Sequence, residues 1–331
     1  MSLSLQSFED PCPCFIVGMS RGGTTWLTKL LNSHTDCVAL GETTFWSRGY
    51  IKPSSSDLRY TEREFIAAKR ILAKTRLITA GDEIGSLKKL SQQAWEDLVD
   101  GILYKSQTPS ELFSFAMETV CEIEGKSRWI EKTPHHLNSI DRIISGYPTA
   151  KFIVQVRDPY GFMSSYKFQG ERKEEAAKKY FRRLYHPIAC AMLWKRYYQR
   201  SIAAAGHYPD NVQLLNFNDL KSEPCRVYRE VLEFLDLNVS PFPSEVQDKN
   251  SSFNSSVKRK LSNADIYWMN MLASAEIGES KSIKKYATCF SFDILISLLR
   301  LPVWFFWLLG PVRKKIQVPF FSYIWRWVMG R

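Results

Sequence analysis

The sequence predicts an α/β fold, with a central parallel sheet flanked by helices, a helical cap insertion and an apolar C-terminal helical tail. Short apolar runs alternate with stretches whose apolar residues recur at helical spacing. A long, mainly helical stretch interrupts this alternation, and the end of the chain is mostly apolar with basic residues between. We therefore expect a main domain over 1–285 that contains a cap at about 45–125, and a tail over 286–331.

The apolar runs predict five strands, near residues 14–17, 38–40, 129–131, 151–156 and 212–217. A helix should follow the first strand and continue to about Asn32. Within the cap, Thr108-Pro-Ser-Glu111 has the pattern of a helix start. A helix after the last strand should turn its apolar side chains inward, namely Val227, Val231, Leu232 and Leu235.

The composition limits the kinds of binding partner and the cellular compartment that we expect. The chain has 45 basic and 34 acidic residues, a net charge of +11, which suits an anionic ligand or surface. A basic protein without a polyanionic partner stays open, and no pattern indicates nucleic-acid binding. The seven cysteines are scattered, which predicts reduced thiols in a reducing compartment. Because we find no apolar leader, we expect a cytoplasmic protein, or one peripheral on a membrane.

A glycine-rich loop follows the first predicted strand. Gly18, Gly23 and Thr25 fit the spacing of the phosphate-loop pattern G-x-x-x-x-G-K-[ST]. Thr24 occupies the lysine position, and Arg21 within the loop supplies a positive charge instead. A strand, a glycine turn and a helix start direct backbone N–H groups at one spot, which suits a phosphate or a sulfate. Without the lysine, we expect a use other than ordinary ATP chemistry.

Charged residues also follow the other predicted strands. Glu42, Lys132 and Arg157 come just after strand ends, as Arg21 does. In a parallel α/β sheet, ligands gather at the carboxyl ends of the strands. We therefore expect these four side chains to point toward one edge of the sheet.

Four ordered segments resemble the sulfotransferases that use the donor 3′-phosphoadenosine 5′-phosphosulfate (PAPS). The loop at 20–26 is similar to their 5′-phosphosulfate loop, and 156–165 is similar to their 3′-phosphate motif, with Arg157 eight residues before Ser165. The segments 131–134 and 217–224 also match, so the resemblance covers about 14–235. Their order is closest to the branch of tyrosylprotein and bacterial sulfotransferases. One departure is Gly22, where the family often has serine.

The resemblance implies a role for each matching residue. Lys132 would stabilise the leaving oxygen as the catalytic lysine, assisted by Arg21. Arg157 and Ser165 would hold the 3′-phosphate, and no metal is expected. The loop would hold the 5′-phosphosulfate through five residues: Arg21, Gly22, Gly23, Thr24 and Thr25.

Transfer to a hydroxyl also needs a general base. We select Glu42, which follows Gly41 at a strand end, 21 residues after Arg21, and resembles the glutamate of the glutamate-using branch. His135 and His136 remain alternatives, since the cytosolic branch uses a histidine. The acceptor is expected to be a small or lipid-like molecule with a hydroxyl, or secondarily an amine. A nucleotide-dependent kinase and a non-catalytic membrane-associated scaffold are the competing functions.

The tail predicts a membrane contact. Residues 289–309 are mostly apolar, and basic and aromatic residues follow to Met329. The length is sufficient to span a bilayer, but Asp293 and Arg300 make spanning costly. We therefore expect helices lying in the membrane interface. Docking on the core and a subunit contact stay open, and the oligomeric state is not predicted.

Overall fold

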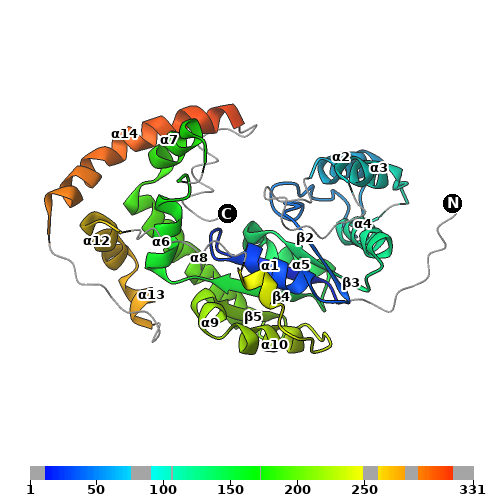
Figure 1. Cartoon of the computed structure of the whole chain (residues 1–331). Coiled ribbons are helices and arrows are strands. Elements are labelled where there is room, and N and C mark those ends of the chain that lie inside the picture. Colours follow the sequence, from blue (N-terminus) through cyan, green and yellow to red (C-terminus); the bar gives the residue numbers. More distant parts are fainter. Residues whose placement is uncertain are drawn as a thin grey trace. The chain divides into compact units, whose positions relative to one another are not determined.

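The computed structural model of the chain describes residues 12–75, 91–105, 107–171, 173–248, 260–279 and 290–315 (Figure 1). The expectations on the first eleven residues, on Cys289 and on the aromatic stretch after residue 315 lie outside these residues. The chain divides into two compact units, which are described separately. The first comprises residues 1–155, 204–215 and 219–253, and the second 156–203, 216–218 and 254–331.

A five-stranded parallel sheet forms the centre of the fold, as predicted. Its strand order is β2-β3-β1-β4-β5. The bounds are β1 Cys14–Gly18, β2 Cys37–Leu40, β3 Arg128–Lys132, β4 Lys151–Val156 and β5 Val212–Asn216. All five predicted strands are present, with ends shifted by at most one residue. At the last of them, Phe217 starts helix α9 (Phe217–Ser222) instead of ending the strand.

An aromatic core covers one face of the sheet. Phe15 on β1 is in register with Phe152 on β4, and their rings stack 5.2 Å apart. Trp129 on β3 meets Phe15 edge-on at 5.5 Å. Phe113 from α4 (Pro109–Glu124) stacks on Phe15 at 6.4 Å. These large rings bury much apolar area, so α4, within the range expected for the cap, packs directly on the sheet.

Three helices of the first unit start at a side-chain cap from a serine or a threonine. Thr108 and Glu111 form a reciprocal capping box at the start of α4, which confirms the predicted helix start. Thr61 and Glu64 form another at the start of α2 (Glu62–Ala73). This helix contacts α3 (Gln92–Gly101) through a hydrogen bond of 3.1 Å from Trp95 Nε1 to Leu72 O. The other bounds are α1 Thr24–Asn32, η1 Pro134–Ser139, α5 Ile140–Gly146, α10 Pro224–Phe234 and α11 Ser244–Asp248.

The second unit is helical. Its buried Asp265 accepts hydrogen bonds from Lys167 Nζ at 2.5 Å and from the Tyr185 hydroxyl at 2.6 Å, which ties three segments together. The bounds are α6 Pro159–Lys167, α7 Glu175–Leu184, α8 Pro187–His207, α12 Asn263–Leu272, α13 Ser274–Glu279 and α14 Phe292–Lys315. No helix within the described residues combines the length and the apolar content that crossing a membrane requires. The six cysteines that the structure describes are free thiols, as predicted.

Candidate functional site

The loop after β1 is anchored to β4 by its first glycine. Gly18 has φ 124°, and a Cβ there would lie 2.3 Å from the Gln155 carbonyl oxygen. Only glycine tolerates both that dihedral angle and that approach. The next residue, Met19, donates its N–H to the same oxygen at 3.1 Å. The loop therefore starts at a fixed point on the sheet edge.

A tight turn then places Arg21 on the outside. The Gly22 N–H donates to Met19 O at 2.8 Å and closes the turn. Arg21 is exposed and has φ 67°, an uncommon conformation for a residue with a side chain. Because the Gly22 N–H is used inside the turn, it does not point at a ligand as we expected. The sequence pattern alone did not reveal this bond.

The start of α1 offers the anion-binding groups of the loop. Gly23, the N-cap residue, has φ 97° and forms no side-chain cap. The N–H groups of Gly23, Thr24 and Thr25 bond to no acceptor within the described part of the chain. Such free N–H groups and the helix dipole together favour an anion. The geometry therefore suits a phosphate or a sulfate at this helix start.

An ion pair joins two of the predicted site residues. The Nζ atom of Lys132 lies 3.0 Å from Oε1 of Glu42. The lysine side chain is only 1% exposed, whereas that of the glutamate is 42% exposed. Lys132 ends β3 in register with Ile16 on β1, two residues before Gly18. The strand register therefore brings the ammonium group to the edge from which the glycine loop begins.

A buried carboxylate behind this pair was missed at the sequence level. Glu131 is fully buried, and its oxygens accept from Thr43 N at 3.0 Å, Thr43 Oγ1 at 2.8 Å, Thr133 Oγ1 at 2.5 Å and His136 Nδ1 at 3.0 Å. Burial raises the pKa of Glu131, but His136 and the other donors lower it by more. The bonds to Thr43 and Thr133 fix the segments that carry Glu42 and Lys132. The sequence did offer one indication of this role, because a glutamate within a predicted buried strand needs hydrogen-bond or charged partners.

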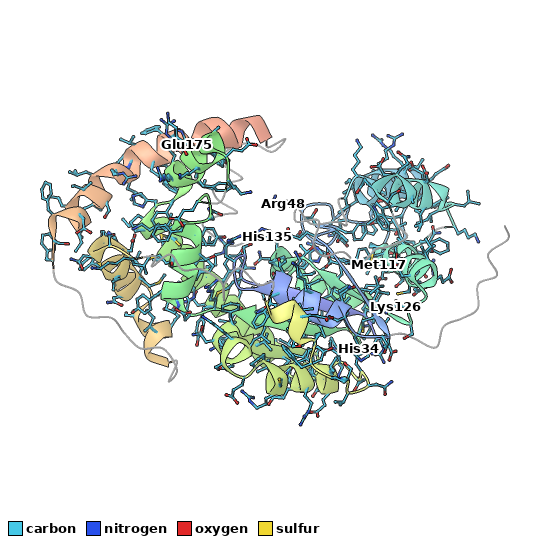
Figure 2. The ribbon with its side chains drawn as sticks, in the orientation of Figure 1. His34, Arg48, Met117, Lys126, His135 and Glu175 are labelled. Atoms are coloured by element: carbon cyan, nitrogen blue, oxygen red, sulfur yellow. The ribbon has the colours of Figure 1, made fainter. Side chains whose placement is uncertain are left out.

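The two histidines differ in what they can do. His136 is fully buried, and its Nε2 accepts from Trp46 N at 3.2 Å while Nδ1 bonds to Glu131. Both nitrogens are engaged, which argues against a role as base. His135 is partly exposed, and Figure 2 shows it beside Arg48. Burial, with a smaller effect of Arg48, lowers the pKa of His135 to about 4.

Arg157 and Ser165 belong to the second unit. The Arg157 guanidinium lies 4.5 Å from the centre of the Phe217 ring, and the Arg157 carbonyl accepts from Trp194 Nε1 at 2.8 Å. Asp158 caps α6 by accepting from the Gly161 N–H at 2.6 Å, and Ser165 lies on that helix. Phe217 therefore positions the arginine, a role that the sequence pattern did not indicate.

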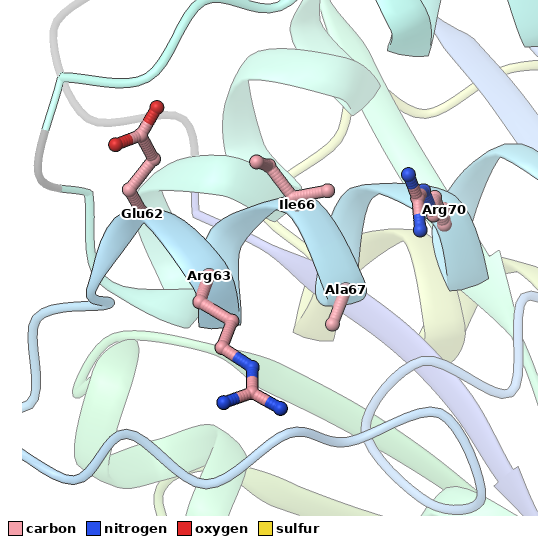
Figure 3. A pocket seen from close by; sticks show the side chains of 5 residues that line it. All are labelled: Glu62, Arg63, Ile66, Ala67 and Arg70. Carbon is pink, nitrogen blue, oxygen red and sulfur yellow. The ribbon is translucent and has the colours of Figure 1, made fainter.

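Two other features lie outside the predicted site. Phe45 and Trp46, aromatic residues after Glu42, are 0% and 1% exposed and belong to the core. A hollow on the surface of α2 is lined by side chains from that helix alone and includes none of the predicted site residues (Figure 3). Its lining consists of Glu62, Arg63, Ile66, Ala67 and Arg70.

Comparisons with known proteins identify a family and a fold for this chain. A family model described as the sulfotransferase family matches residues 13–241. The sulfotransferase domain of the Synechococcus PCC 7002 olefin synthase superposes with a TM-score of 0.50 at 15% identity, over 82% of this chain and 97% of that one. Two further solved structures are similar at 15% identity. The sulfotransferase domain of the curacin biosynthetic pathway has a TM-score of 0.48, covering 89% and 99% of the two chains, and STF9 of Mycobacterium avium has 0.45, covering 82% and 77%.

A comparison with curated protein sequences gave no match. At 15% identity, the structural likeness to the olefin synthase domain establishes the fold only. The family model matches well over half of the 331 residues and includes the glycine loop, Glu42, Lys132, Arg157 and Ser165. On this match, the chain belongs to the sulfotransferase family.

Proposed function

We propose that this protein transfers a sulfuryl group from PAPS to a hydroxyl group of an acceptor. The observation that carries the proposal is the ion pair of Glu42 and Lys132 at 3.0 Å, at the sheet edge where the glycine loop begins. The pair supplies a proton acceptor and a cation side by side. Sulfuryl transfer needs both, because a proton leaves the acceptor while negative charge grows on the departing oxygen.

The loop is suited to the phosphosulfate end of the donor. The N–H groups of Gly23, Thr24 and Thr25 have no acceptor within the described residues, and the exposed Arg21 lies next to them. A doubly charged anion at this helix start would gain charge-assisted hydrogen bonds. PAPS would supply the activated sulfuryl group, and these residues would hold and orient it.

Lys132 would stabilise the leaving oxygen. Its ammonium group is buried, so its attraction to a developing negative charge is less screened than on the surface. A preplaced cation loses little free energy to reorganisation when the reaction occurs. Glu42, which is 42% exposed, would accept the proton of the incoming hydroxyl group. An amine acceptor is the second choice for the same geometry.

Arg157 and Ser165 would recognise the 3′-phosphate. This assignment rests on their spacing of eight residues, which is similar to that of the family motif. The ring of Phe217 holds the Arg157 guanidinium in place, as an arginine that binds a phosphate in two contacts requires. The acceptor would be a small or lipid-like molecule.

A binding experiment separates this function from a kinase. Adenosine 3′,5′-bisphosphate should raise the melting temperature of the full chain more than an equal concentration of ADP with Mg²⁺ does, since the stabilisation by a ligand grows with the logarithm of its concentration divided by its Kd. The reverse order would favour the nucleotide-dependent phosphotransferase.

A second experiment identifies the acceptor. The protein is incubated with ³⁵S-labelled PAPS and an extract of the source cells, and labelled products are identified by mass spectrometry. The Lys132→Ala variant is the control that separates enzymatic transfer from background labelling. If label appears equally with this variant, the non-catalytic scaffold is the better reading.

A further inference from the structure

Helix α14 presents a continuous apolar face to solvent. Four exposed apolar residues follow one another along the helix at spacings of seven, four and three residues. These spacings place their side chains on one side of the helix, opposite the buried Ile294 and Ser297. They are Phe292, Leu299, Val303 and Phe306, exposed by 73%, 68%, 70% and 70%. We call these four residues the apolar row. A monomer rarely exposes such a row without a use for it.

The second unit holds this helix firmly. The Ser297 carbonyl bonds to His186 Nε2 at 3.0 Å, and the Ser297 hydroxyl accepts from Trp268 Nε1 at 2.7 Å. Trp304 Nε1 donates to Leu184 O, at the end of α7, at 3.0 Å. These polar bonds fix which side of α14 faces outward, so the apolar row is exposed by the packing of the helix.

A basic helix lies beside the apolar one, and Figure 1 shows α7 along α14. The rings of Tyr180 and Trp307 meet at 5.8 Å. Lys179, Arg182 and Arg183 of α7 are exposed, and no described residue forms an ion pair with them. We call these three residues the α7 cations.

The one acidic residue of α7, Glu175, lies in the first turn of the helix. Lys178 is paired with Glu175 at 3.3 Å, and Figure 2 shows Glu175 on this helix. That carboxylate is neutralised locally, so the later turns of α7 keep their positive charge.

On another side of α14, an apolar groove of about 360 Å³ separates it from α8. Ile188 and Met192 form one wall, and Leu301, Pro302 and Phe306 form the other. No charged side chain lines it. Phe306 belongs to both the groove and the apolar row, so the two apolar surfaces are continuous.

We propose that α7 and α14 form a surface that docks on bilayers containing acidic phospholipid. The apolar row would enter the boundary between headgroups and acyl chains, and the α7 cations would contact the lipid phosphates. The charge of this surface favours acidic headgroups, because each lysine or arginine near an anionic leaflet adds about 1 kcal/mol of attraction. This surface lies wholly within the second unit, and the proposal does not depend on the sulfuryl transfer reaction.

Flotation with vesicles tests the proposal on the full chain. One set of vesicles is phosphatidylcholine, and the other contains about 30% phosphatidylserine, whose charge creates the negative surface potential. The protein should float with the acidic vesicles and be released at high salt. Leu299→Glu with Val303→Glu should weaken binding more than ten-fold, since two apolar contacts are lost. Replacing the three α7 cations by Gln should weaken it by up to roughly 100-fold, at about five-fold for each charge.

Matched variants elsewhere on the chain control for general effects. Leu103→Glu changes a leucine that is 73% exposed in the first unit. Arg63→Gln, Arg70→Gln and Lys74→Gln together remove three exposed charges from α2 and its C-cap. Both controls should bind as the wild type does, and melting curves establish that every variant is folded.

Three results would overturn the proposal. The first is a full chain that floats with neither kind of vesicle, and the second is a loss of binding by the controls equal to that of the α7 and α14 variants. The third is a dimer in light scattering that Leu299→Glu with Val303→Glu dissociates while vesicle binding is absent. That result would assign the apolar row to a second copy of the chain.

Discussion

The buried ammonium of Lys132 and the half-exposed carboxylate of Glu42 are bonded to each other at 3.0 Å. The carboxylate neutralises a charge that is costly to bury alone. In the proposed reaction, each group must turn to a different partner, the lysine to the leaving oxygen and the glutamate to the acceptor hydroxyl. The same contact therefore links the stability of the free protein to its chemistry.

Glu42→Gln should remove the proposed general base and leave donor binding unchanged. The amide keeps the size of the side chain and can still accept a hydrogen bond from Lys132, but it cannot take a proton. We expect kcat to fall by about 10² to 10⁴, the usual contribution of a general base. The affinity for adenosine 3′,5′-bisphosphate, measured by calorimetry, should change by less than about two-fold. Glu62→Gln on the surface of α2 is the control, and a Glu42→Gln variant that keeps most of its activity would exclude Glu42 as the base.

The pair itself can be tested by a double-mutant cycle in urea. Glu42→Ala leaves Lys132 buried without its carboxylate, so the free energy of unfolding should fall by about 1 to 3 kcal/mol. Fully buried pairs lose more, and Glu42 is 42% exposed. Lys132→Met removes the buried charge and should cost little. The double variant should recover part of the loss, which gives a coupling energy of about 1 to 2 kcal/mol. Strictly additive effects would mean that the contact does not contribute to stability.

The sequence predicted the parts of this site that are local in the chain. The five strands, the glycine loop and the start of α4 follow from apolar runs, glycine spacing and a capping box, each within about ten residues. Strand ends also placed Glu42 and Lys132 at one edge, because parallel strands share that edge.

The parts that could not be predicted depend on contacts between distant residues. The bonds of Glu131 to Thr43 bridge 88 residues, and Phe217 supports Arg157 from 60 residues away. Nothing local distinguishes His136, whose nitrogens are both engaged, from its partly exposed neighbour His135. The Gly22 N–H was assigned to the ligand because the turn bond to Met19 depends on dihedral angles rather than on residue type.

His135 should make the fold sensitive to mild acid. Burial and Arg48 lower the pKa of His135 to about 4 from its ordinary value of 6.5, and Glu42 opposes this only in part. In the unfolded chain, His135 therefore becomes protonated below pH 6.5, whereas in the folded chain it stays neutral until about pH 4. The contribution of the neutral imidazole to the free energy of unfolding is fully present above pH 6.5. It is lost as the pH falls toward 4, and the loss is about 3 kcal/mol at most.

Urea unfolding at several pH values measures this effect. His135→Asn should flatten the loss of stability between pH 6.5 and 4, and Arg48→Gln should reduce it by raising the pKa of His135. His207→Gln, at the exposed end of α8, controls for the loss of one imidazole. If His135→Asn keeps the wild-type slope, the imidazole is not excluded from protonation in the folded protein.

Substitutions of Gly22 test why this loop has glycine where the family often has serine. The glycine closes a tight turn, and a serine would add a hydroxyl group. A Cβ at this position would lie 2.7 Å from the Met19 carbonyl oxygen, inside the turn that the Gly22 N–H closes. Gly22→Ser and Gly22→Ala should therefore both displace the loop and weaken PAPS binding about ten-fold or more, equivalent to about 1.4 kcal/mol. A serine variant that binds PAPS more tightly than the wild type would show that the loop relaxes and gains the hydroxyl contact.

Substitutions of Arg157 and Phe217 test the proposed recognition of the 3′-phosphate. Arg157→Ala should weaken binding of adenosine 3′,5′-bisphosphate by roughly 10- to 150-fold, because a charge-assisted hydrogen bond contributes about 1.5 to 3 kcal/mol. Binding of AMP, which lacks that phosphate, should change little. Phe217→Leu removes the ring 4.5 Å from the guanidinium and should cost about two- to thirty-fold, since such a contact is worth about 0.5 to 2 kcal/mol.

Two controls separate positioning from general damage. Phe217→Tyr keeps a ring under Arg157 and should bind adenosine 3′,5′-bisphosphate nearly as the wild type does. Phe181→Leu removes another ring beneath a cation, Lys173, in the same unit and should leave the affinity unchanged. If Arg157→Ala weakens AMP as much as the bisphosphate, then Arg157 does not read the 3′-phosphate. If Phe217→Leu has no effect while Arg157→Ala does, the arginine acts without support from the ring.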